Sequence, residues 1–300
     1  MIFSTSSSSE KRKKFREALK SGSLLRFPGA ISPLVALQIE KLGFEGVYIS
    51  GAVLSNDLGY PDIGLTTLTE VSHRGRQIAR VTKLPSVIDI DTGFGEPMNV
   101  TRTVQELTEL GLSGCHLEDQ VNPKRCGHLD NKGIVDTQDM IKKIKAAERG
   151  KTDTNFLLIA RTDARASEGL EKAIERAKAY VDAGAEMIFP EALQNEQEFE
   201  KFRKAISVPL LANMTEFGKS RLLSCKELSQ LGYNLVIYPV TTLRLAMKAI
   251  EEGLQHILEE GSQETILDRM QHRKELYELV RYEEYNQFDQ SIYNFTINKK

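Results

Sequence analysis

The chain has 300 residues, of which 40% are hydrophobic and 27% are charged. This composition supports a large buried core and excludes an intrinsically disordered or fibrous protein. The formal net charge of −2, from 40 basic and 42 acidic residues, excludes a chain that nucleic acid or an anionic membrane attracts by overall charge.

The cysteines indicate a reducing compartment. There are three, Cys115, Cys126 and Cys225, and no two have the C-x-x-C spacing. No apolar stretch near the N-terminus resembles a secretion signal, and no apolar run reaches the roughly 18 residues of a membrane helix. We therefore expect a cytoplasmic protein that does not enter a membrane, with Cys115 and Cys225 packed as small apolar residues.

The N-terminal residues 1–10 form a serine-rich stretch, which we expect to be a disordered tail. From Glu10 to Lys20, Phe15, Ala18 and Leu19 recur among basic residues with the spacing of a short amphipathic helix. We expect the basic face of this helix to be exposed to water.

Short apolar segments rich in β-forming residues then alternate with helical segments. The eight apolar segments are 24–27, 46–49, 86–90, 114–117, 156–159, 185–189, 209–212 and 235–238. The helical segments include 33–42, 68–82, 99–110, 137–149, 169–183, 196–205 and 219–231, and several precede a glycine that would cap them. This alternation predicts an α/β fold, a (β/α)8 barrel of the TIM type in one domain over residues 1–300, with an open doubly wound sheet as the weaker alternative. Residues 263–290 form an extra C-terminal helical segment.

Polar residues follow the expected strands at the end where barrel enzymes build their active sites. Asp89 and Asp91 are two apart and are expected to point to the same side, as are His116 and Glu118 on the next strand. Neighbouring carboxylates repel each other unless a cation lies between them, and oxygen ligands favour Mg2+ or Mn2+ over Zn2+. The pattern therefore predicts a divalent metal at Asp89 and Asp91, and the alternative is that one aspartate caps a helix or bonds loop amides.

Arg161 ends the fifth strand, where a buried guanidinium needs an anion. Either Glu191, at the end of the sixth strand, or a substrate carboxylate would provide it. Asn213 and Thr215 are two apart at the end of the seventh strand and would donate to a second carboxylate, although such pairs also occur as turn residues.

The segment Lys124-Arg125-Cys126-Gly127-His128 surrounds a thiol with positive charge. Nearby cations lower the pKa of a cysteine, and Gly127 lets the backbone approach a ligand closely. We interpret Cys126 as a reactive group, and the alternative is a basic surface loop that happens to contain a cysteine.

Together these motifs resemble the isocitrate lyase and phosphoenolpyruvate mutase superfamily. The resemblance rests on residues 50–51 (SG), 89–95 (DIDTGFG), 124–128 (KRCGH), 159–164 (IARTDA), 189–191 (FPE) and 213–218 (NMTEFG). The cysteine element is the most specific, because the lyases of the superfamily carry it and the mutases and decarboxylases lack it. The resemblance implies a Mg2+-dependent carbon–carbon lyase that cleaves (2S,3R)-2-methylisocitrate to pyruvate and succinate, in propionate breakdown through the methylcitrate cycle.

The resemblance also implies roles for individual residues. Asp89 and Asp91 would hold the metal, with Asp62 and Glu118 as further candidates near it. Cys126 would protonate the succinate half, Tyr48 is the candidate base for the substrate hydroxyl, and Lys124 and His128 would complete the catalytic group. The residues implied to bind substrate are Ser50, Gly51, Ala52, Cys126, Gly127, Arg161, Glu191, Asn213, Met214, Thr215, Arg244 and Arg273. Ala52 replaces a glycine of many relatives, which is tolerated only if its φ is negative.

Other activities stay open at this point. They are cleavage of isocitrate or 2,3-dimethylmalate, decarboxylation of oxaloacetate and, from a different class, binding of dicarboxylates without catalysis. The resemblance further implies a homotetramer in which the C-terminal helices exchange between subunits, although that segment would pack equally well on its own barrel. The expected partners are a small tricarboxylate substrate and further copies of the chain, with no nucleic acid and no membrane.

Overall fold

The computed structural model describes residues 6–125, 127 and 133–294, and its core is a ring of parallel strands. In these residues the strands are β1 (Leu25–Pro28), β2 (Val47–Ile49), β3 (Ser86–Asp89), β4 (Gly114–Glu118), β5 (Leu157–Thr162), β6 (Met187–Pro190), β7 (Leu211–Asn213) and β8 (Leu235–Tyr238). Strands β2 to β6 pair in sequence, and β8 pairs with both β7 and β1. Single bridges from Gly29 to Tyr48 and from Ile188 to Leu210 close the two remaining seams. The predicted (β/α)8 barrel is confirmed, and the open sheet is excluded.

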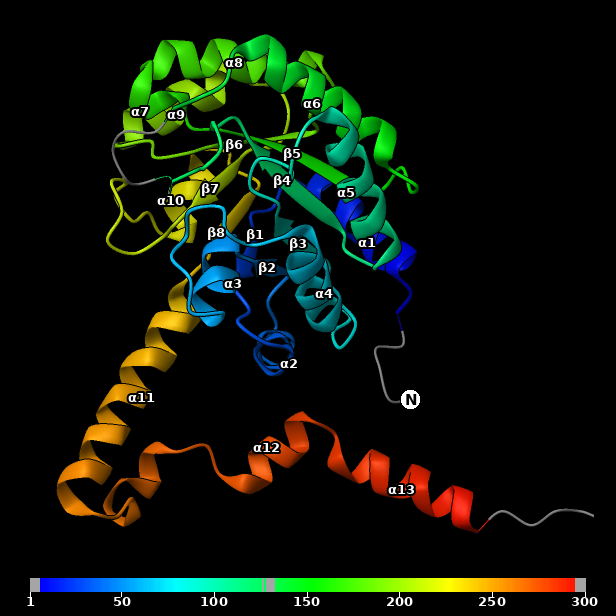
Figure 1. Cartoon of the computed structure of the whole chain (residues 1–300), viewed down its shortest axis with the longest axis vertical. Helices are drawn as coiled ribbons and strands as arrows, with labels where there is room; N and C mark the ends of the chain where they lie inside the picture. The colour runs from blue at the N-terminus through cyan, green and yellow to red at the C-terminus, as the bar shows by residue number, and fades with distance from the viewer. Residues whose placement is uncertain (1–5, 126, 128–132, 295–300) are drawn as a thin grey trace, which may run out of the picture.

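Helices alternate with these strands and surround the ring (Figure 1). They are α1 (Ser8–Lys20), α2 (Pro33–Lys41), α3 (Gly51–Asp57), α4 (Leu68–Ala79), α5 (Pro97–Glu109), α6 (Thr137–Gly150), α7 (Ala164–Ser167), α8 (Leu170–Asp182), α9 (Glu196–Ala205) and α10 (Cys225–Gln230), followed by α11 (Thr241–Glu260), the 3-10 helix η1 (Glu264–Arg269), α12 (Arg273–Leu279) and α13 (Tyr282–Tyr293). Most predicted helices are confirmed to within a few residues. The exception is 219–231, where helix α10 begins only at Cys225 because the Ser224 side chain caps the amide of Glu227.

Helix α1 differs from the expectation for the N-terminus. It begins at Ser8, where Ser7 and Glu10 form a capping box, so residues 7–10 belong to a capped helix and not to the expected tail. Residues 1–5 of that stretch lie outside the described residues. Two of its basic side chains are buried: Lys11 and Arg12 are 4% and 5% exposed. The Lys11 ammonium donates to the carbonyl of Ala79 at 2.8 Å, and Arg12 donates to the carbonyl of Leu112 at 2.8 Å. The prediction of a solvated basic face was wrong for Lys11 and Arg12, because these cations satisfy carbonyls at and just beyond helix ends, which have no partner inside a helix, whereas Lys13, Lys14 and Lys20 are exposed as expected.

Two apolar layers stabilise the barrel. The inner layer fills the ring of strands, and Phe15 and Leu19 of α1 close its amino-terminal end. The outer layer lies between the strands and the surrounding helices and includes Cys115, which is fully buried as expected. Cys225 is only half-buried, and its Sγ lies 3.1 Å from the Tyr238 hydroxyl.

The C-terminal part of the chain leaves the barrel as a long arm (Figure 1). None of the 20 residues of α11 is buried, and the helical segment expected at 263–290 consists of η1, α12 and α13. Helix α12 returns to the barrel, where it contacts α2. Within the described residues no helix combines the length and the apolar character that crossing a membrane requires.

Candidate active site

A cavity of about 320 Å³ lies at the carboxyl ends of the strands. Twelve residues that the sequence nominated line it: Tyr48, Ser50, Ala52, Asp62, Asp89, Lys124, Gly127, Arg161, Glu191, Asn213, Thr215 and Arg244. The remaining lining residues are Asn56, Phe189, Ile237, Pro239, Val240, Leu243 and Met247, which sequence reasoning did not select. Most of these are apolar and belong to β8 and the first turns of α11. An apolar residue beside a strand end has the same signature as a core residue, so no signal in the sequence distinguishes it.

The two aspartates of the expected metal site converge on one point. A Cβ atom added to Gly51 would lie 2.9 Å from Oδ2 of Asp89 and 3.2 Å from Oδ1 of Asp91, so both carboxylates reach the same place. The convergence does not come from strand alternation, since β3 ends at Asp89 and Asp91 has a left-handed backbone with φ of 47°. The amide of Asp91 donates to Oδ1 of Asp89 at 3.0 Å, which holds this turn in place.

Lys124 ties these carboxylates to the cysteine loop. It is 3% exposed, and its Nζ lies 2.9 Å from Oδ1 of Asp91 and in contact with Asp62. Burial alone would lower the pKa of Lys124, but the carboxylates of Asp91, Glu118, Asp62 and Asp89 raise it above its usual value. Lys124 is therefore a permanent cation beside the two aspartates.

The protonation of the aspartates follows from the same surroundings. Burial and the charge of Asp89 raise the pKa of Asp91 to about 6, although Lys124 opposes the shift. Burial would also raise the pKa of Asp89, but His116, Lys124 and Arg161 outweigh it and the net shift is downward. One carboxylate is thus firmly ionised, and the other titrates near neutrality.

These residues fit a hard divalent cation. Mg2+ is usually held by one or two carboxylates and keeps several water ligands, and two converging carboxylates supply that set. Glu118 is 1% exposed, and its Oε1 has no hydrogen-bond partner among the described residues, so a third buried oxygen is available nearby. Burial raises the pKa of Glu118 well above its usual value, although the charges of Arg161 and Lys124 oppose the shift. The described residues contain no group of three or more acidic, histidine or cysteine side chains arranged to hold a metal, so water or substrate oxygens would complete the shell.

Tyr48, the candidate base, contacts a buried histidine. Its hydroxyl lies 2.6 Å from Nε2 of His116, and Nδ1 of His116 lies 3.6 Å from Oδ1 of Asp89. Register explains the second contact, because Asp89 on β3 is paired with His116 on β4. Burial lowers the pKa of His116 and raises that of Tyr48, so both are neutral at rest. His116 carries its proton on Nδ1, which faces Asp89. Its Nε2 therefore accepts a hydrogen bond from the Tyr48 hydroxyl.

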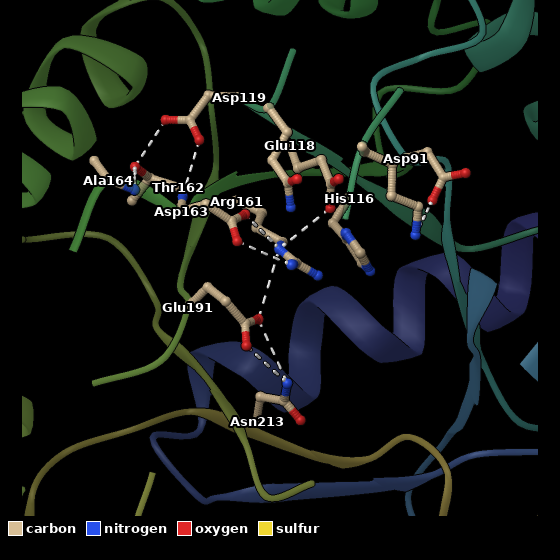
Figure 2. A network of polar contacts seen from close by, with 12 residues as sticks. Asp91, His116, Glu118, Asp119, Arg161, Thr162, Asp163, Ala164, Glu191 and Asn213 are labelled. Carbon is tan, nitrogen blue, oxygen red and sulfur yellow. Dashed lines mark hydrogen bonds and ion pairs between the residues drawn. The ribbon is translucent and has the colours of Figure 1, made fainter. Parts of the chain in front are cut away.

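Arg161 lies among three carboxylates, as Figure 2 shows. Asp163 binds it with both oxygens, at 2.9 and 3.2 Å, and Oε2 atoms of Glu118 and Glu191 lie 3.3 and 3.5 Å from its Nε. Burial alone would lower the pKa of Arg161, but Asp163, Glu118 and Glu191 raise it. The sequence suggested Glu191 as the partner and missed Asp163, although the spacing of two residues was a signal for it.

Gly127 is packed against this cluster. A Cβ atom at this position would overlap the Arg161 guanidinium and lie 2.6 Å from Cγ of Glu191. The absence of a side chain therefore lets the loop backbone approach these two residues. Cys126 and His128, the neighbours of Gly127, lie outside the described residues.

The other substrate-binding candidates differ in their placement. Asn213 donates to both oxygens of Glu191 at 3.4 Å (Figure 2), whereas the side chain of Met214 points away from the cavity and accepts from the amide of Leu223. Ser50 caps α3, and Ala52 has no positive φ, so its replacement of glycine introduces no strain. The side chain of Met214 therefore does not line the cavity, and its role in substrate binding stays a prediction.

The two arginines expected to bind substrate also differ. Arg244 lies at the rim of the cavity, donates to the carbonyl of Glu216 at 2.7 Å and stacks on Phe217. Arg273 begins α12 on the C-terminal arm and does not line the cavity of its own chain. The sequence could not reveal that Arg273 lies away from the cavity, because its position depends on the direction in which α11 leaves the barrel.

Comparisons with known proteins find relatives that match most of the chain. The family model described as phosphoenolpyruvate phosphomutase matches residues 15–258. A protein of Corynebacterium glutamicum named probable 2-methylisocitrate lyase 2 is 60% identical over 287 residues, which cover 96% of this chain and 94% of the relative. A structure of oxaloacetate acetylhydrolase with 3,3-difluorooxalacetate has a TM-score of 0.90 at 32% identity and covers 97% of this chain and 99% of its own. A structure of phosphonopyruvate hydrolase with oxalate and Mg2+ has a TM-score of 0.85 at 29% identity, with 95% and 99% covered.

Proposed function

The chain belongs to the phosphoenolpyruvate phosphomutase family, and we propose that within it the protein is the lyase that cleaves (2S,3R)-2-methylisocitrate to pyruvate and succinate. The observation that carries the proposal is the convergence of the Asp89 and Asp91 carboxylates beside Gly51, at the edge of the cavity that Asp89 lines together with the buried guanidinium of Arg161. A metal site beside an anchored cation suits a substrate that carries a hydroxyl and several carboxylates. The relative named 2-methylisocitrate lyase supports the choice of substrate, and the pathway would be the methylcitrate cycle in the cytoplasm.

Asp89 and Asp91 would hold Mg2+, or Mn2+ in its place. When bound, the cation would stabilise negative charge on the substrate oxygens of the pyruvate half. The Mg2+ and oxalate in the phosphonopyruvate hydrolase structure support this choice, since oxalate resembles the enolate of pyruvate in shape and charge.

Tyr48 and His116 would take the hydroxyl proton of the substrate. Tyr48 is neutral at rest, so it acts by passing its own proton to Nε2 of His116, 2.6 Å away, while it receives the proton of the substrate hydroxyl. The oxygen then forms the carbonyl of pyruvate as the carbon–carbon bond breaks. Both electrons of that bond remain on the succinate half.

Arg161 would bind a carboxylate of the pyruvate half, and Asn213 and Thr215 would donate to a carboxylate of the succinate half. Glu191 would orient Asn213 through the contacts at 3.4 Å. Cys126 would deliver the proton that the succinate carbanion needs. This role rests on the sequence, and its support is that Lys124 and Gly127, on either side of it, line the cavity.

The arm formed by α11, η1, α12 and α13 would pack against a neighbouring subunit in a homotetramer. Apolar side chains at Met247, Ile250, Leu254, Ile257 and Leu258 follow helical spacing on α11 and are between 42% and 85% exposed. An apolar stripe of this kind is stable in water only when it is covered. In such an assembly Arg273 would reach the cavity of a neighbour and not its own.

A substrate panel tests the proposed reaction. Purified protein with Mg2+ is offered 2-methylisocitrate, isocitrate, 2,3-dimethylmalate and oxaloacetate, and the products are identified by chromatography. We expect pyruvate and succinate from 2-methylisocitrate at the highest kcat/KM. A higher kcat/KM with another compound of the panel would identify that compound as the substrate. Binding of dicarboxylates without turnover would indicate a binding protein and not an enzyme.

A further inference from the structure

Asp119 is a fully buried acid next to the active site that has no contact with the cavity. It follows Glu118 at the end of β4, and its exposed fraction is 0%. Because successive residues of a strand face opposite sides, Glu118 points toward Arg161 and Asp119 points toward the surrounding helices. Its burial needs an explanation, since a carboxylate away from water must be satisfied by donors.

Three donors from two elements satisfy it. Oδ1 of Asp119 accepts from the amide of Asp163 at 2.9 Å, and Oδ2 accepts from the Thr162 hydroxyl at 2.8 Å (Figure 2). The third donor is the hydroxyl of Tyr180 on α8, also at 2.8 Å from Oδ2. Asp119 therefore connects the end of β4, the end of β5 and a helix of the outer layer.

The outer end of this connection is itself fixed. Nη1 of Arg176 donates to the Tyr180 hydroxyl at 3.2 Å and to the carbonyl of Val135 at 2.8 Å. The same guanidinium binds Glu168 with two hydrogen bonds of 2.7 and 2.8 Å. Tyr180 consequently has little freedom to move, and its hydroxyl holds Asp119 in place from the side of α8.

The inner end reaches the active site through one residue. The amide of Asp163 donates to Asp119, and both carboxylate oxygens of Asp163 accept hydrogen bonds from Arg161. A bidentate pair fixes the plane as well as the position of a guanidinium. Glu118 and Glu191 lie farther from Arg161, at 3.3 and 3.5 Å, so Asp163 is its closest anchor. A shift in the backbone at Asp163 would thus rotate Arg161 away from any bound carboxylate.

We propose that Asp119 is a positioning residue, which sets the orientation of Arg161 by fixing the backbone of Asp163 and the side chain of Thr162. The proposal rests on the proposed function in one respect, that Arg161 binds a carboxylate of the substrate. It assigns a role in substrate binding to a residue that substrate does not touch. The side chains from α8 extend this support to the outer layer of the barrel.

The test compares Asp119→Ala with a variant that loses similar contacts at the other end of the barrel. Asp153→Ala is that control, because Asp153 also accepts three hydrogen bonds, from Arg12 and from the amide and side chain of Asn155. We expect Asp119→Ala to lower kcat/KM for 2-methylisocitrate by about 10- to 100-fold, mainly through KM, since the contact that suffers is a charged hydrogen bond. Asp153→Ala should lose about as much thermal stability as Asp119→Ala and should keep the kcat/KM of the wild type. Equal kcat/KM values in the two variants would overturn the proposal.

A double variant separates positioning from general loss of structure. If Asp119 acts through Arg161, adding Asp119→Ala to Arg161→Lys should cause almost no further loss of kcat/KM. A full additional loss would contradict the proposal. Should Asp119→Ala fail to fold, Tyr180→Phe serves instead, because it removes the donor that holds Asp119 on the side of α8. We expect Tyr180→Phe to lower kcat/KM mainly through KM, and an unchanged kcat/KM would overturn the proposal.

Failure of the proposed function is recognised separately. If the wild type does not cleave 2-methylisocitrate, the same variants are titrated with pyruvate in the presence of Mg2+ by calorimetry. Weaker pyruvate binding in Asp119→Ala than in Asp153→Ala would support the positioning role without any turnover. Equal pyruvate binding in the two variants would overturn it.

Discussion

The Nζ atom of Lys124 lies 2.9 Å from Oδ1 of Asp91, so the loop that carries the cysteine motif is tied to one of the two carboxylates that converge beside Gly51. This contact keeps two like charges close together before any metal binds. It also couples the position of the loop to the charge at the expected metal site.

Removing one of the two carboxylates should weaken metal binding. We expect Asp91→Asn to raise the Kd for Mg2+ by about 10-fold or more, as one charged ligand is lost. Calorimetric titration with Mg2+ measures this. Asp57→Asn is the matched control, because Asp57 is an acid at the end of α3 that pairs with Arg74 outside the cavity. If both variants bind Mg2+ like the wild type, the metal lies elsewhere.

The Tyr48 hydroxyl should matter for turnover more than for binding. Tyr48→Phe removes the group that contacts His116 at 2.6 Å and leaves the ring in place. We expect kcat to fall by about 100-fold or more with little change in KM, because proton transfer by a positioned side chain typically increases the rate of the chemical step by a factor of this order. Steady-state kinetics with 2-methylisocitrate give both values. An unchanged kcat would remove Tyr48 from the proton path.

Much of the barrel was predictable from the sequence because its signals are local. Strands, helices and the glycine caps follow from spacing and residue type within about ten residues. The pairing of Asp89 with His116 and of Glu118 with Arg161 depends on register between strands, and it was not predicted from the sequence. Contacts that depend on distant chain segments were not predictable. The sequence of α1 shows its cations but not the carbonyls that accept hydrogen bonds from them. The apolar stripe on α11 does not reveal the direction of the arm.

The burial of Lys11 predicts a specific dependence of stability on pH. Burial lowers the pKa of Lys11 to about 8, from a usual value of 10.5, with a smaller opposing effect from Glu40. Between these two values the unfolded chain binds more protons than the folded one, so the free energy of unfolding rises with pH in this window and the contribution is absent below it.

Urea unfolding at pH 7.5 and pH 10 measures this effect. Relative to Lys11→Met, the wild type should gain on the order of 2 kcal/mol of stability at the higher pH. Lys13→Met is the matched control, because Lys13 is an exposed lysine on the same helix, and relative to it no such gain is expected. A difference between wild type and Lys11→Met that stays constant with pH would contradict the assignment.

The apolar stripe on α11 should control the assembly. We expect Leu254→Glu to shift the protein from the proposed tetramer to smaller species, because Leu254 is 62% exposed in the single chain and would be buried against a neighbour. Gln255→Glu adds the same charge one position away, off the stripe, and should leave the assembly intact. Sedimentation velocity distinguishes the species. A wild type that sediments as a monomer would refute the exchange of the arm.

The central claim is tested most directly by product release from 2-methylisocitrate and, separately, isocitrate, with Mg2+ and with an added chelator. We expect pyruvate release from 2-methylisocitrate to be faster than glyoxylate release from isocitrate, to stop when the chelator is added and to resume with excess Mg2+. The Cys126→Ser variant should release no pyruvate above the uncatalysed rate. Faster glyoxylate release, pyruvate release that the chelator does not affect, or full turnover by Cys126→Ser would contradict the account.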